Sequence, residues 1–177
     1  LARRLREHAS PRPWSPLVLI QPDGPGRPFF CVHPGGGNVL CYADLARRLG
    51  PERPFYGFQA RGIEDAQEPL DRLEEMAAQY IEAMRAVQPE GPYLLGGWSL
   101  GGHVAFEMAQ ELLRRGQDVG LLAILDTPSR AELPAEAPDD ARIVGDLLRG
   151  LGVEVPDADL RALDPDALLR WARDLFV

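Results

Sequence analysis

Apolar and polar residues follow two different rhythms along this chain, and together they predict an α/β protein. Short apolar runs predict strands at 17–20, 28–33, 53–58, 93–97 and 119–125. Between them, apolar residues recur every three or four positions, as on one face of a helix, over 42–49, 73–87 and 100–115. Strands that alternate with helices imply a mostly parallel sheet with helices on both faces.

The two ends of the chain and one internal segment break this rhythm. Residues 1–16 begin as a charged helical segment and pass into a proline-rich stretch, which predicts a linker. Glycine and proline in 21–26 predict a turn, and we expect the strands on either side of it to form a hairpin. Beyond the core, which we expect to span 17–130, residues 131–177 hold two proline-bounded amphipathic stretches. These predict small helices at 143–151 and 166–176.

Composition excludes several kinds of chemistry. The 177 residues carry a net charge of −8, and all 19 basic residues are arginine. A Walker lysine, a pyridoxal Schiff base and a Ser–Lys pair are therefore excluded. No stretch gathers enough arginine to neutralise a phosphate backbone, so we expect no nucleic-acid partner. The longest strongly apolar run, 119–125, is far shorter than the roughly 20 residues of a membrane span, so we expect no membrane partner.

Two further features bear on the origin of the chain. Cys31 and Cys41 are the only cysteines, which is no disulfide framework, and we therefore expect a cytoplasmic location. The first residue is Leu1 rather than methionine, and no apolar signal segment follows it. We interpret the chain as a piece of a longer polypeptide.

The strongest chemical signal is a serine between a predicted strand and a predicted helix. Residues 97–101 read GWSLG, which fits the pattern G-x-S-x-G. A strand that turns into a helix within about two residues strains the backbone of Ser99 and exposes its hydroxyl. Gly97 and Gly101 leave room for this turn, and the helix N-terminus offers unpaired amides where an oxyanion would form. We predict a catalytic nucleophile; the alternative is a serine in an ordinary tight turn.

A second glycine-rich segment follows an earlier predicted strand. Residues 33–38 read HPGGGN and resemble the HGGG-type loop of esterases, which supplies the second oxyanion donor. Gly35 is the candidate for that amide. The alternative is that the three glycines only provide a flexible connection.

The sequence offers a candidate for the acid of a serine hydrolase but no histidine where the base is expected. Asp126 ends the strand after Ser99, where it would orient an imidazole; the alternative is an aspartate that caps the next turn. A histidine base should follow this aspartate, and none occurs in 127–177. We expect His33 to position the glycine-rich loop and His103 to have a structural role.

With these residues in place, the chain resembles the thioesterase domains of nonribosomal peptide synthetases and polyketide synthases. The resemblance covers Pro13 to about Phe176. Its most specific parts are FFCVHPGGG at 29–37, YLLGGWSLGG at 93–102, AFEMA at 105–109 and the strand end at 125–126.

The resemblance implies an α/β-hydrolase fold with a Ser-Asp-His triad and a helical lid inserted after the aspartate strand. It implies that Ser99 is the nucleophile, Asp126 the acid, and the amides of Leu100 and Gly35 the oxyanion donors. The lid would begin near Ala131, and the chain would stop inside it, before the histidine.

The resemblance also implies the substrate and the partner. Residues 1–5 resemble the tail of a carrier domain, which would deliver an acyl or peptidyl thioester on its phosphopantetheine. Ser99 would accept the acyl chain, and water or an internal amine or hydroxyl would release it as an acid or a macrocycle. No bound cofactor and no metal are expected.

Four alternatives stay open. A free-standing proofreading thioesterase would share the chemistry. A generic carboxylesterase or lipase would share the serine turn and the glycine-rich loop. A malonyl-type acyltransferase would use the serine without needing Asp126. A non-catalytic module that binds a carrier domain would explain the missing histidine.

Overall fold

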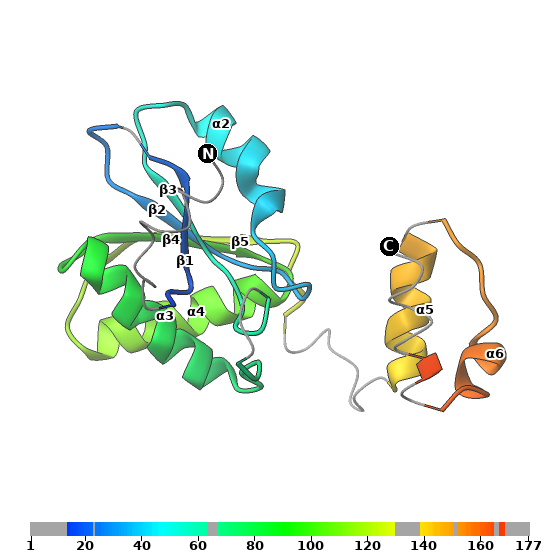
Figure 1. Cartoon of the computed structure of the whole chain (residues 1–177). Helices are drawn as coiled ribbons and strands as arrows, with labels where there is room; N and C mark the ends of the chain where they lie inside the picture. The colour runs from blue at the N-terminus through cyan, green and yellow to red at the C-terminus, as the bar shows by residue number, and fades with distance from the viewer. Residues whose placement is uncertain are drawn as a thin grey trace, which may run out of the picture. The chain divides into compact units, whose positions relative to one another are not determined.

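A computed structural model describes residues 14–22, 24–63, 67–129, 139–150, 152–164 and 167–168 (Figure 1). The chain divides into two compact units, Leu1–Thr127 and Pro128–Val177. Most of the predicted linker, residues 1–13, lies outside the described residues, and 14–16 have no regular structure.

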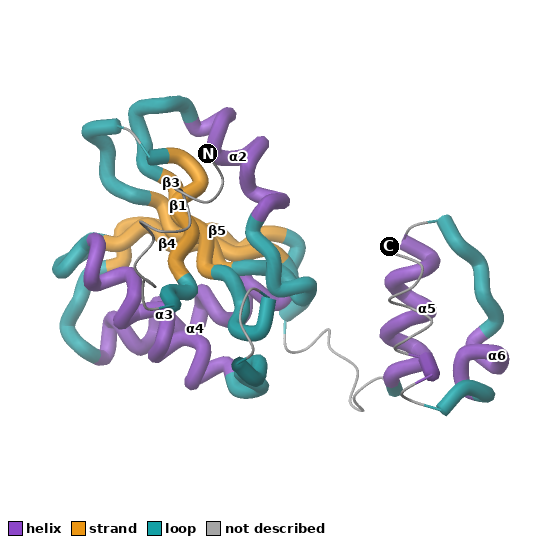
Figure 2. Tube along the Cα trace, in the orientation of Figure 1, coloured by secondary structure: helices purple, strands orange, loops and turns teal. Residues whose placement is uncertain are grey.

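The first unit is built on a five-stranded sheet with the strand order β1-β3-β2-β4-β5. Its strands are the orange segments in Figure 2. β1 runs antiparallel to β3, and the other three neighbouring pairs are parallel. The predicted mostly parallel sheet is therefore confirmed. The strands are β1 Leu17–Gln21, β2 Phe29–Val32, β3 Phe55–Phe58, β4 Tyr93–Trp98 and β5 Val119–Leu125.

The predicted hairpin between the first two strands is wrong. β1 pairs with β3, with Leu17 opposite Phe58, while β2 lies between β3 and β4. All four residues of β2 are buried, and such a strand is stable only with partners on both edges and apolar layers on both faces. β1 is only partly buried, so it occupies the edge of the sheet beyond β3.

Helices cover both faces of the sheet, as predicted (Figure 1). The helical segments of this unit are a 3-10 turn η1 Leu40–Tyr42, α2 Ala43–Leu49, α3 Leu73–Val87 and α4 Leu100–Arg114. On one face, Phe30 and Phe58 pack against α3 and α4, which contact each other. On the other face, Phe29 and Phe55 pack against Ala46 of α2.

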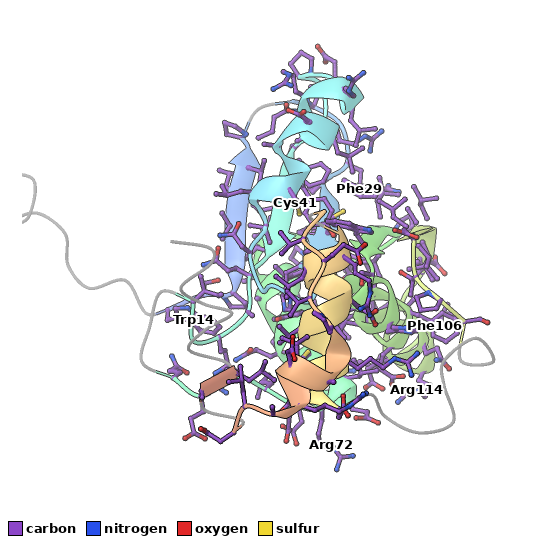
Figure 3. All side chains as sticks on the ribbon, turned by 90° about the vertical axis from the view of Figure 1, so that its right-hand side faces the viewer. Trp14, Phe29, Cys41, Arg72, Phe106 and Arg114 are labelled. Carbon is purple, nitrogen blue, oxygen red and sulfur yellow. The ribbon has the colours of Figure 1, made fainter. Side chains whose placement is uncertain are left out.

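The solvent-exposed side of α4 carries both apolar and charged side chains. Phe106 and Arg114, both labelled in Figure 3, are exposed there, and Arg114 pairs with Glu107 at 2.9 Å. The guanidinium of Arg115 lies 2.6 Å from Glu111 on α4 and 3.2 Å from Glu82 on α3. Exposed pairs of this kind contribute about 0.2–1 kcal/mol, so apolar packing rather than charge holds the two helices together.

The second unit contains α5 Asp140–Gly150 and α6 Asp157–Arg161. α5 confirms the helix predicted at 143–151, although it begins three residues earlier. α6 was not predicted, because five residues are too few to show a helical period. The helix predicted at 166–176 falls on residues that, apart from 167–168, lie outside the described part of the chain.

The two helices of this unit share a small apolar cluster. Ala141, Val144 and Leu148 of α5 are buried with Leu160 of α6 and Leu168. None of the helices in the described ranges has the length and apolar character that a membrane crossing requires.

Candidate active site

The carboxyl ends of β2 and β4 form the topological switch point of the sheet. After β2 the chain passes through α2 to β3 on one side, and after β4 it passes through α4 to β5 on the other. Ligands of open α/β sheets bind in the crevice that such a reversal leaves. The glycine-rich loop follows β2 and Ser99 follows β4, so the fold brings both predicted catalytic segments to this crevice.

Ser99 forms a strained turn between β4 and α4. Its φ of 54° and ψ of −123° define a conformation that residues other than glycine rarely adopt. The Ser99 amide donates to the Leu125 carbonyl at 3.0 Å, and its carbonyl accepts from the Gly102 amide and the Thr127 hydroxyl at 2.9 Å each. These bonds fix the strained backbone. No pattern in the sequence singles out Thr127, because its partner Ser99 lies 28 residues away on another element.

Two glycines make the turn sterically feasible. A Cβ atom on Gly97 would overlap the Gly101 carbonyl, and one on Gly101 would overlap the carbonyl of Val32. The second contact brings the first turn of α4 against the end of β2, where the glycine-rich loop begins. The first turn of α4 contains no acidic residue, so no carboxylate of the helix itself offsets its positive dipole end.

We expect Gly97→Ala to lower the free energy of unfolding by about 1–3 kcal/mol or more, because the clash is with fixed backbone. Urea unfolding of the protein that contains this domain measures it. Gly36→Ala is the matched control, since a Cβ there meets nothing within 4 Å, and its effect should stay within about 0.5 kcal/mol. Equal stability of the two variants would contradict the packing described here.

His33 anchors the glycine-rich loop rather than acting as a base. It is 2 % exposed, its Nδ1 lies 2.7 Å from the Pro34 carbonyl, and its Nε2 lies 2.9 Å from the Tyr80 hydroxyl. A carbonyl only accepts, so Nδ1 carries the proton and Nε2 accepts from Tyr80. Burial raises the pKa of Tyr80, which keeps this hydroxyl protonated. The sequence indicated only that Tyr80 belongs to the apolar stripe of α3.

The state of His33 gives the fold a pH dependence. Burial lowers the pKa of His33 from its ordinary 6.5, and the hydrogen bond to Pro34 offsets part of this change. His33 therefore takes up a proton near pH 6.5 in the unfolded chain, but stays neutral at that pH in the folded chain. The stability that the fold gains from a neutral His33 is complete above that pH. It is lost as the pH falls through the pKa of His33 in the folded chain, and the free energy of unfolding then decreases by up to about 1.4 kcal/mol per pH unit.

Urea unfolding between pH 7.5 and pH 5.5 tests this pH dependence. We expect His33→Gln to flatten the loss of stability on acidification relative to the wild-type protein. Identical slopes in the two proteins would show that His33 is not held neutral.

A cavity of about 240 Å³ lies beside the predicted oxyanion donors. Both Gly35 and Leu100 line it, so the structure brings these two predicted site residues to one space. The rest of its wall is mainly apolar, with one guanidinium. These other residues include Arg61, Ile63, Leu70, Met76 and Tyr80.

Asp126 lies at the carboxyl end of β5, beside the serine turn. Trp98 pairs with Leu125 in the β4–β5 register, so the residues that follow them, Ser99 and Asp126, are neighbours at the same edge. Asp126 is exposed and has a φ of 45°. In the described part of the chain its carboxylate accepts from the Trp98 indole at 3.3 Å, not from an imidazole.

A serine turn between a strand and a helix, at the carboxyl end of a mostly parallel sheet, defines a chain of the α/β-hydrolase fold. The sequence matches the Thioesterase domain family over residues 27–164. The chain belongs to this family.

Relatives and solved structures agree with this assignment. A dimodular nonribosomal peptide synthase of Bacillus subtilis (strain 168) is 42% identical over 174 residues, which is 98% of this chain and 7% of that protein. A four-domain nonribosomal peptide synthetase, solved in its holo form with AMP and glycine, superposes with a TM-score of 0.79 at 32% identity, over 98% of this chain and 14% of that one. The NocB thioesterase domain, solved as a covalent complex with a fluorophosphonate nocardicin G analogue, gives 0.68 at 34% identity, over 79% of this chain and 61% of that one.

Proposed function

We propose that this domain releases an acyl or peptidyl chain from a carrier domain through an acyl ester on Ser99. The observation that carries the proposal is the strained backbone of Ser99 at the switch point of the sheet, beside a cavity lined by Gly35 and Leu100. A conformation that costs about 1–3 kcal/mol persists where surrounding structure holds it, and such positions concentrate at active sites.

The chemistry follows from this arrangement. The Ser99 Oγ attacks the thioester carbonyl carbon, and its proton passes to the general base. The carbonyl oxygen becomes an oxyanion, which the amides of Leu100 and Gly35 stabilise, and the carbon–sulfur bond then breaks. The leaving thiolate takes up the proton. Water, or an amine or hydroxyl of the chain itself, then attacks the ester and regenerates Ser99.

The general base in this proposal is a histidine outside these 177 residues. His33 has both ring nitrogens engaged with Pro34 and Tyr80, so it has no free nitrogen for Ser99. The solved NocB thioesterase domain is longer than this chain, which covers 61% of it. Asp126, exposed at the strand end next to Ser99, would orient the imidazole and stabilise its charged form.

The nucleophile has support from a relative. The NocB thioesterase domain forms a covalent complex with a fluorophosphonate, and reagents of this class phosphonylate activated serines. We infer that Ser99 is the corresponding target in this domain.

The carrier domain is proposed as the neighbour that delivers the substrate. The matches to the Bacillus synthase and to the four-domain synthetase extend over 98% of this chain, so they include most of the segment before β1. We propose that residues 1–16 continue from a carrier domain and that 131–177 belong to a lid. A synthetase context favours release of a finished chain over a free-standing proofreading role.

The test compares substrates in the whole protein that contains this domain. We expect kcat/KM for an acyl thioester on the carrier domain to exceed that for the same acyl group on a simple oxygen ester by at least about tenfold, because contacts to the carrier add binding energy at the transition state. Preference for the oxygen ester would identify a generic esterase. Carrier binding without turnover would identify a binding module, and either result would overturn the proposal.

A further inference from the structure

We infer that the hydroxyl of Tyr42 is a spacer that sets the distance between the two oxyanion donors, and hence that Tyr42 is a positioning residue for catalysis. This inference rests on the proposed function. The hydroxyl donates to the Val32 carbonyl at 2.6 Å and accepts from the Trp98 amide at 2.9 Å. It therefore joins the last residue of β2 to the last residue of β4.

The bridge lies where the ladder between these strands ends. β2 and β4 pair in parallel register up to Val32 opposite Gly97. In a parallel ladder, the amide after a paired residue bonds directly to the facing carbonyl. Here that next bond would run from Trp98 to Val32, and the hydroxyl of Tyr42 is inserted between them. The hydroxyl therefore holds these two strand ends farther apart than a direct hydrogen bond between Trp98 and Val32 would.

Both predicted oxyanion donors lie a few residues after the strand ends that the Tyr42 hydroxyl joins. Leu100 follows Trp98 by two residues, and Gly35 follows Val32 by three. With so few residues between the bridge and each donor, the separation of the strand ends constrains the separation of the two amides. An oxyanion needs both donors within about 2.7–3.1 Å, and a misplacement of about 1 Å can cost a hundredfold in rate.

Apolar packing fixes the ring of Tyr42. The residue is 3 % exposed and belongs to the apolar cluster on the α2 face of the sheet, with its ring centroid 6.2 Å from that of Phe55. Tyr42 also ends the loop that contains Gly35, and its own amide donates to the Val39 carbonyl at 3.1 Å. One residue thus joins both ends of the glycine-rich loop to the strand that carries Ser99.

Tyr42→Phe isolates the hydroxyl, because it keeps the ring and removes both bridging bonds. Tyr93→Phe is the matched control. Tyr93 also has a buried ring, and its partly buried hydroxyl donates to the Pro89 carbonyl at 3.0 Å, at the amino end of β4, away from Ser99. Each variant loses a hydroxyl with a backbone partner, so each should lower Tm by a few degrees.

The experiment measures kcat and KM for thioester hydrolysis, Tm, and the rate of phosphonylation by a fluorophosphonate, in the whole protein and its variants. We expect Tyr42→Phe to lower kcat and the phosphonylation rate by about tenfold to a hundredfold with little change in KM, because in both reactions negative charge develops on an oxygen that the two donors stabilise. Tyr93→Phe should keep both rates.

The outcomes separate this inference from the function on which it rests. If wild type acylates Ser99 and the two variants have the same kcat, Tyr42 only stabilises the fold and the inference is overturned. If Tyr42→Phe raises KM and leaves kcat and phosphonylation unchanged, the hydroxyl affects substrate binding instead, and the inference is again overturned. If wild type shows no reaction at Ser99, the proposed function itself fails.

Discussion

Ser99→Ala is expected to reduce kcat for thioester release by about 10⁴-fold or more, because removal of the nucleophile of a triad leaves only binding and oxyanion stabilisation. The substitution should preserve the fold. The backbone of residue 99 is held by its amide and carbonyl, through Leu125, Gly102 and Thr127, and the side-chain hydroxyl contributes to none of these bonds. Single-turnover kinetics with an acyl-loaded carrier domain measure the change.

Ser15→Ala is the control for this variant. Ser15 Oγ accepts from the Leu17 amide at 3.2 Å, in an exposed position before β1, so its loss should leave kcat near the wild-type value. Retention of more than a tenth of the wild-type rate in Ser99→Ala would show that another group attacks the substrate.

Asp126→Asn should lower kcat by about 10²–10⁴-fold, since a neutral amide neither fixes the tautomer of a catalytic imidazole nor stabilises its charged form. Asparagine tolerates a positive φ about as well as aspartate, so the φ of 45° at this position remains accessible. Its amide oxygen can still accept from the Trp98 indole. We therefore expect Tm to stay close to that of wild type while kcat falls.

Asp118→Asn provides the comparison for Asp126→Asn. Asp118 is exposed and precedes the amino end of β5, so it is an aspartate at the opposite end of the same strand. It should leave kcat unchanged. If Asp126→Asn behaved like Asp118→Asn, the serine would be working without this acid, as the malonyl-type acyltransferase alternative supposes.

The sequence predicted the elements of the first unit because their signals are local. The apolar stripe of α3 and the short apolar runs of the strands need no knowledge of distant residues. The partner of β1 is not a local property. It depends on β2 being buried on both faces, which leaves the edge of β3 for β1, and neighbouring segments of sequence cannot show this.

The candidate site was predictable to a similar degree and for the same reason. Ser99 lies in a five-residue motif, and Gly35 and Asp126 follow predicted strands. Tyr42 and Tyr80, by contrast, fit apolar helical patterns, and only the fold shows that their hydroxyls bond to Trp98 and His33. The role of a polar atom on an apolar stripe depends on its partners, and Trp98 lies 56 residues from Tyr42 while His33 lies 47 residues from Tyr80.

The most direct test of the central claim is to trap the acyl-enzyme. The whole protein is mixed with an acyl-loaded carrier domain, quenched within one turnover, and digested for peptide mass spectrometry. We predict one acyl adduct, on the peptide that contains Ser99, and its loss in Ser99→Ala. An adduct on another nucleophile, such as the exposed thiol of Cys41, or product formed with no adduct at any time, would contradict the account.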